Sequence, residues 1–219
     1  MIFRIKIFLL LIMCGFSISI FAQNELFKSP VADVSENIAL RTISQLFQNK
    51  PIVRANFTQS KKIKILTRPL ISSGSLLFSN DSGLYWKIKK PFSSIMILSE
   101  KGLTQLTNGE KKSLLKSTNS SSAQNFMNTF LFMFNGKFVE AERHFKLYFT
   151  QHKTRWTLGL IPKNKPISNV IKNIQFSGNQ QQLLVNFKLR ETSGDVTAIQ
   201  FTDVRFQPIL SAQEKNYFE

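Results

Sequence analysis

The feature that most constrains the fold is a two-residue alternation of apolar and polar side chains within residues 73–102. Leu84, Trp86 and Ile88 alternate with a tyrosine and two lysines, which is the period of a strand with one buried and one wet face. The turn before them, at residues 80–83, consists of Asn, Asp, Ser and Gly, which tolerate tight backbone geometry. This stretch therefore predicts a β-meander with one continuous apolar surface.

The same alternation, punctuated by glycine and asparagine, recurs along most of the chain. We expect further strands over residues 53–66, 103–107, 111–116, 145–151, 154–161, 171–176, 183–189 and 196–201. The apolar run 95–98 has no alternation, so its strand should be central in the sheet or covered on both faces. No repeat or linker divides the chain. The pattern predicts a mainly β (α+β) fold: an antiparallel sheet of about eleven strands, curled around two or three helices in a single domain.

Helical spacing first appears at residues 34–48, where Asp33 and Glu36 have the spacing of a capping box and Pro51 marks the end. Residues 139–144 could form another helical turn, and residues 210–218 a short helix.

Another predicted helix, over residues 123–134, carries an unusually aromatic face. Phe126, Phe130 and Phe134 lie four residues apart, and Gly136 follows. The ordinary interpretation is a core helix. The functional interpretation is a lid whose soft inner face contacts varied apolar ligands. The chain holds 21 phenylalanines, more than a small core needs, so both interpretations stay open.

The N-terminus has the layout of a secretory signal peptide. Arg4 and Lys6 precede an uncharged apolar run over residues 7–21, and Ala22 offers a cleavage point. We expect residues 1–22 to be removed near Ala22 and residues 23–219 to act in the periplasm, with a retained anchor as the alternative. Cys14 is the only cysteine, so the mature chain would have no disulfide.

The charge of the chain favours anionic partners. Lys and Arg number 29 against 13 Asp and Glu, a formal charge of +16. Nucleic acid, an anionic membrane surface and an acidic partner all fit this imbalance, and export disfavours nucleic acid.

Catalytic motifs are absent from the sequence. The two histidines, His144 and His152, have no carboxylates at metal-ligand spacing, and there is no Gly-x-Ser-x-Gly elbow or Walker-type loop. We predict no enzyme activity, no catalytic residue, no metal and no cofactor.

The order of short motifs resembles the LolA family, the periplasmic carriers of outer-membrane lipoproteins. Residues 57–59 (Phe-Thr-Gln) are followed by Gly74-Ser-Leu, by Trp86 with Pro91 five residues on, and by the Ile-Met-Ile-Leu run. The helix with Phe126 and Phe130, and the later Trp156 strand, extend the resemblance over nearly all of the mature chain.

The resemblance implies an incomplete antiparallel β-barrel closed by helices, with a hydrophobic cavity for acyl chains. It implies a monomeric carrier that takes lipidated cargo from an inner-membrane transporter to an outer-membrane acceptor, with transient membrane contact. The residues expected to line the cavity are Phe57, Leu76, Phe78, Leu84, Trp86, Ile88, Ile95, Ile97, Phe126, Phe130, Phe134 and Trp156.

One position departs from the family pattern. Where the family has Arg-Pro before the Trp strand, this chain has Asn80-Asp81, and neither Arg54 nor Lys87 can be assigned the role of that arginine. The cargo is therefore a lipoprotein or another lipid. The alternative function is a non-enzymatic envelope module, on the same fold, that binds or senses a protein.

Overall fold

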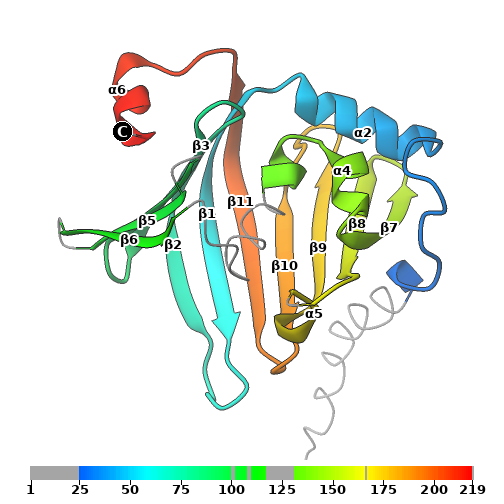
Figure 1. Ribbon diagram of the computed structural model, residues 1–219, viewed down its shortest axis with the longest axis horizontal. Coiled ribbons are helices and arrows are strands. Elements are labelled where there is room, and N and C mark those ends of the chain that lie inside the picture. Colours follow the sequence, from blue (N-terminus) through cyan, green and yellow to red (C-terminus); the bar gives the residue numbers. More distant parts are fainter. Residues whose placement is uncertain (1–24, 100–101, 108–109, 117–130, 166, 219) are drawn as a thin grey trace, which may run out of the picture.

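One strongly curved antiparallel sheet organises the chain (Figure 1). The computed structural model describes residues 25–99, 102–107, 110–116, 131–165 and 167–218. Within these residues the sheet has eleven strands, in the order β6-β5-β4-β3-β2-β1-β11-β10-β9-β8-β7. The strands are β1 (Ile52–Lys62), β2 (Leu70–Ser79), β3 (Gly83–Lys90), β4 (Ser94–Ser99), β5 (Gly102–Thr107), β6 (Glu110–Lys116), β7 (Phe145–His152), β8 (Arg155–Pro162), β9 (Ile171–Asn179), β10 (Asn186–Glu191) and β11 (Val196–Gln207).

The sheet is open between β6 and β7. Within each half of the sheet, β1–β6 and β7–β11, each strand pairs with the strand that follows it in sequence. The two halves are joined because β1 pairs with β11. The two strands that are consecutive in sequence but stand at opposite edges are therefore β6 and β7. This arrangement confirms the predicted incomplete antiparallel barrel of about eleven strands.

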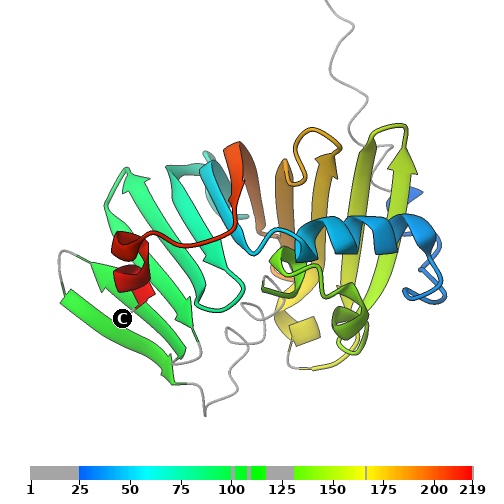
Figure 2. The same ribbon diagram turned by 90° about the horizontal axis from the view of Figure 1, so that it is seen from above.

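Alternation along each strand defines an inner and an outer face. On β3, Leu84 and Trp86 are buried, whereas Tyr85 between them and Lys87 after them are only partly covered. The inner face of the sheet is the one that carries Trp86. Figure 2 shows this face curving around helices α2 (Ile38–Gln48) and α4 (Phe138–Glu142).

Helix α2 is four residues shorter at its start than the sequence pattern predicts. Its N-cap is Asn37, whose side-chain oxygen accepts a hydrogen bond from the Leu40 N–H at 2.9 Å. Asp33 instead accepts bonds from the backbone and hydroxyl of Ser35, so it is engaged in a local turn. The capping box that the sequence predicts at Asp33 and Glu36 was therefore wrong.

Some strand boundaries differ from the predicted ones, because pairing with a distant strand sets them. β1 ends at Lys62 rather than at residue 66, and β11 runs to Gln207 because β1 pairs along its whole length. Helix α5 (Ile167–Val170) was not predicted. The expected short C-terminal helix is present as α6 (Ala212–Lys215) and the 3₁₀ turn η1 (Asn216–Phe218). In the described part of the chain, no helix is long and apolar enough to cross a bilayer.

Candidate functional site

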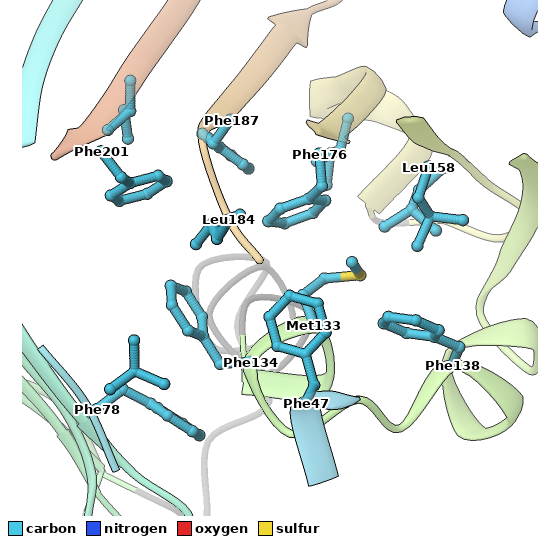
Figure 3. Close-up of a cluster of buried hydrophobic side chains, with 14 of the residues drawn as sticks. Phe47, Phe78, Met133, Phe134, Phe138, Leu158, Phe176, Leu184, Phe187 and Phe201 are labelled. Carbon is cyan, nitrogen blue, oxygen red and sulfur yellow. The ribbon is translucent and has the colours of Figure 1, made fainter. Parts of the chain in front are cut away.

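A cluster of aromatic side chains fills the centre of the inner face (Figure 3). Phe134, from the helical residues 131–134, lies between the two halves of the sheet. Its ring is 5.1 Å from that of Phe78 on β2 and 6.4 Å from that of Phe201 on β11. Met133 and Phe134 are 2% and 1% exposed. At this point the interior is closed by side chains from the sheet and from the helix.

Helices α2 and α4 pack on the β7–β10 half of the inner face. Phe47 of α2 makes edge-to-face contacts with Phe138 of α4 at 6.1 Å and with Trp156 of β8 at 6.0 Å. The Trp156 Nε1 atom is buried and has no hydrogen-bond partner among the described residues. An aromatic layer therefore joins both helices to the sheet.

Gly136 fixes the end of the 131–134 helix against α2. Its φ is +63°, and a Cβ there would lie 2.3 Å from the Ser44 carbonyl oxygen. Its own carbonyl accepts hydrogen bonds from the Ser44 hydroxyl and, at 3.2 Å, from Gln48 Nε2. Only glycine combines this backbone conformation with so close an approach.

The β1–β3 part of the inner face is built around a stacked aromatic pair. Phe57 lies over Gly74 on the adjacent strand and stacks on Trp86, with ring centroids 4.0 Å apart. A Cβ on Gly74 would lie 2.8 Å from the Phe57 ring and 1.9 Å from the Lys87 carbonyl oxygen. Glycine at residue 74 therefore leaves room for the Phe57 ring and for the close approach of the β3 backbone.

Coverage of the inner face is uneven along the strands: Leu98 of β4 and Leu103 of β5 are buried. Leu76, Leu84 and Trp86 are buried, whereas Ile88 of β3 and Met96 of β4 pack on the same core but are only partly covered. The sealed zone around Phe134 thus continues into an apolar wall that is incompletely covered.

The pairing register of β3 with β4 shows which residues of β4 lie on this wall. Met96 lies opposite Trp86, so it shares the inner face, whereas Ile95 and Ile97 lie opposite Lys87 and Tyr85 on the outer face. The expectation that Ile95 and Ile97 point inward was wrong, because a run apolar on both faces does not reveal its own orientation.

The other expected residues divide into two groups. Those that the structure brings together, buried or partly covered, on the inner face are Phe57, Leu76, Phe78, Leu84, Trp86, Ile88, Phe134 and Trp156. Phe126 and Phe130 lie outside the described residues. Inner-face residues missed by the sequence reasoning include Phe47, Met133, Phe176, Phe187 and Phe201. Each lies in a helix or strand that the sequence predicts, and the apolar period of that element could have assigned the residue to the inner face.

The turn at Asn80-Asp81 lies two residues beyond Phe78. Both side chains are exposed, and the Asn80 N–H donates to the Pro51 carbonyl at 3.0 Å. The contact between β2 and the 131–134 helix is made two residues before this turn, by the aromatic rings of Phe78 and Phe134.

On the outer face, residues 211–218 form a C-terminal clasp over β1 and β3. Arg54 donates to Glu214 through Nε at 2.6 Å and through Nη2, and Tyr217 stacks on Tyr85 with centroids 4.6 Å apart. The Arg54 hydrogen bonds lower the pKa of Glu214 from 4.5 to about 2. A pocket of about 460 Å³ lies beside the clasp, lined by residues that include Arg54, Lys87 and Tyr217.

The described residues hold no group of three or more His, Cys, Asp or Glu side chains that could bind a metal. His144 stacks on the ring of Phe132 at 6.4 Å, and His152 is exposed at the end of β7. The arrangement is suited to burying apolar groups.

Comparison with known proteins agrees with the architecture. Residues 51–214 match the family model described as outer membrane lipoprotein carrier protein LolA. No curated protein sequence matches the chain.

Solved structures that match the chain come from several bacteria. A LolA superfamily protein from Nitrosomonas europaea matches 82% of this chain and 97% of its own, with 8% identity and a TM-score of 0.42. Lipoprotein LppX from Mycobacterium tuberculosis matches 78% and 96%, with 7% identity and a TM-score of 0.45. The MucA/MucB complex from Pseudomonas aeruginosa matches 80% of this chain and 58% of the other, with 9% identity and a TM-score of 0.46.

Proposed function

This chain belongs to the LolA family of outer membrane lipoprotein carrier proteins, and we propose that it is a periplasmic carrier that shields the acyl chains of a lipoprotein or another lipid. Residues 1–22 direct export and are removed near Ala22. The carrier receives its cargo from an inner-membrane transporter and delivers it to an outer-membrane acceptor. Binding is by burial alone, with no covalent step.

The observation that carries the proposal is the partly covered apolar wall beside the sealed zone around Phe134. Ile88 and Met96 continue the inner face of Trp86 but are not fully covered. An acyl chain laid along them would bury its methylenes at about 0.8 kcal/mol each. Phe134 bounds this wall on the side of the buried cluster, since its ring contacts that of Phe78 on β2.

Lipid analysis of the purified protein tests the proposal directly. The protein is recovered from the periplasm, extracted with organic solvent and analysed by mass spectrometry, and the stripped protein is titrated with a fluorescent fatty acid. We expect a co-purified lipid and saturable uptake. The absence of both would refute the carrier function.

Two neighbouring residues on β4 provide a matched pair of variants. Met96→Glu places a charge on the inner wall, whereas Ile95→Glu places the same charge on the outer face of the same strand. We expect Met96→Glu to reduce fatty-acid uptake by tenfold or more and Ile95→Glu to leave it within about twofold. Circular dichroism should show an intact sheet in both. Equal losses in the two variants would exclude this wall as the binding surface.

A protein-binding envelope module on the same fold is the second candidate. The closed packing of Phe134 between Phe78 and Phe201 favours it, because a filled interior needs no ligand. A protein that carries no lipid, takes up no fatty acid and is retained by an envelope protein would support this candidate.

A further inference from the structure

The β1–β2 hairpin exposes several large apolar side chains at its tip. Ile65 is 87% exposed, Leu70 and Ile71 are each 54% exposed, and Leu66 is 42% exposed. Figure 1 shows this hairpin projecting beyond the neighbouring strands at the lower end of the sheet. Scattered exposed apolar residues are normal, but four in and beside the turn of one hairpin mark an interaction surface.

Cations alternate with these apolar residues. Lys62, Lys64 and Arg68 are exposed on the same tip, and the sequence has no acidic residue between Glu36 and Asp81. The acidic groups that face the hairpin come from the β10–β11 turn. Glu191 pairs with Lys61 at 3.4 Å, and the Asp195 carboxylate accepts the backbone N–H of Lys64 at 2.9 Å.

The β3–β4 turn adds a second cluster of the same character. Lys90 lies opposite Ser73 in the β2–β3 register, so this turn is at the same end of the sheet as the β1–β2 tip. Phe92 is 83% exposed, and Lys89 and Lys90 before it are also exposed. We call residues 61–71 and 89–92 together the apolar-basic rim.

The backbone of the tip is held by the protein itself. The Leu66 N–H donates to the Ile63 carbonyl at 3.0 Å, and the Lys64 N–H bond to Asp195 ties the tip to the next hairpin. The exposed side chains are thus presented from an ordered turn, which reduces the entropy lost on binding.

We propose that the apolar-basic rim docks on a membrane surface that contains anionic lipids. Ile65, Leu66 and Phe92 would enter the headgroup region, and the lysines would lie among the phosphates. A projecting tip with aliphatic side chains suits a deformable bilayer better than a nucleic acid, whose backbone offers no apolar surface. The inference does not depend on the interior carrying a lipid.

Vesicle co-sedimentation tests the inference. The protein is recovered from the periplasm, and mass spectrometry verifies that all variants share the same N-terminus. Vesicles of phosphatidylcholine alone are compared with vesicles that also contain phosphatidylglycerol. We expect binding to the anionic vesicles that weakens as salt is raised.

Two variants and two controls separate the contributions. Ile65→Asp should weaken binding to anionic vesicles about tenfold or more, the loss expected when one aliphatic side chain can no longer be buried. Lys62→Gln combined with Lys64→Gln should weaken it about fivefold per lysine. The controls, Ile209→Asp and Lys215→Gln, lie beside the β2–β3 turn at the opposite end of the sheet and should have no effect. Circular dichroism should be unchanged throughout.

The inference is overturned if the protein binds neither kind of vesicle, or binds both equally. It is also overturned if Ile209→Asp loses as much binding as Ile65→Asp, or if the rim retains an envelope protein but no vesicle. The variant Met96→Glu should still bind anionic vesicles, so a failure of lipid carriage can be distinguished from a failure of docking.

Discussion

Arg54 on β1 and Glu214 on α6 form a hydrogen-bonded ion pair although they are 160 positions apart in the chain. The carboxylate also accepts from the Ser211 N–H and hydroxyl, each at 2.8 Å, so one side chain both caps α6 and attaches it to β1. Arg205 lies opposite Arg54 in the β1–β11 register, so Glu214 also offsets the repulsion between two like charges.

Replacement of Glu214 by Gln should make the stability of the protein less sensitive to acid. The folded pKa of about 2 is below the ordinary 4.5, so the stabilisation from ionised Glu214 is complete above pH 4.5 and is lost as the pH falls toward 2. We expect Glu214→Gln to lower the free energy of unfolding by about 1–2 kcal/mol at pH 6 and by less at pH 3. Urea unfolding at the two pH values measures this.

The exposed Glu140 of α4 provides the control for this variant. Glu140→Gln should change the free energy of unfolding by less than about 0.5 kcal/mol at either pH. An equal effect of both variants would mean that the clasp contributes no specific stabilisation.

At the scale of elements, the alternation of apolar and polar residues predicted the strands well. The orientation of β4 and the limits of β11 depend instead on pairing with other strands. The alternation in β3 and β8 is visible in the sequence because each strand has one buried face. The orientation of β4 was not visible, because residues 95–98 are apolar on both faces and only the pairing with β3 assigns Met96 inward. The limits of β11 depend on β1, and α5 is too short to show a helical period.

Gly136→Ala tests how the 131–134 helix is fixed against α2. The new Cβ would meet the Ser44 carbonyl oxygen at 2.3 Å in addition to requiring a left-handed backbone. We expect a loss of about 2–4 kcal/mol in the free energy of unfolding. Gly194→Ala is the matched control, since φ there is +96° but the nearest neighbours are Lys64 side-chain atoms, 3.3 Å away and beyond. It should cost about 1 kcal/mol, and a similar loss in both variants would contradict the close contact.

At the scale of the whole molecule, the incomplete barrel and its apolar inner face could be anticipated from the sequence, but the closed packing around Phe134 could not. A face rich in phenylalanine has the same pattern whether it lines a cavity or fills a core. Only the distances from Phe134 to Phe78 and Phe201 show that the rings meet at this point. The Arg54–Glu214 pair was equally invisible, because no local pattern links residues so far apart.

The proposed export and the single cysteine give a prediction for the intact protein. The protein recovered from the periplasm should begin at Gln23, as measured by mass spectrometry of the whole chain. Because Cys14 would then be absent, its melting temperature should be the same with and without a thiol reductant. A recovered chain that begins at Met1 would indicate a retained N-terminal anchor.

The pairing of β1 with β11 has a consequence for the order of folding. The meander from β1 to β6 can form from residues 52–116 alone, but one edge of β1 has no partner until residues 196–207 are available. Until then, a strand of eleven residues presents open hydrogen-bonding groups that could pair with another chain. Pairing with β11 removes this open edge, so we expect aggregation to be most favoured before that strand is in place.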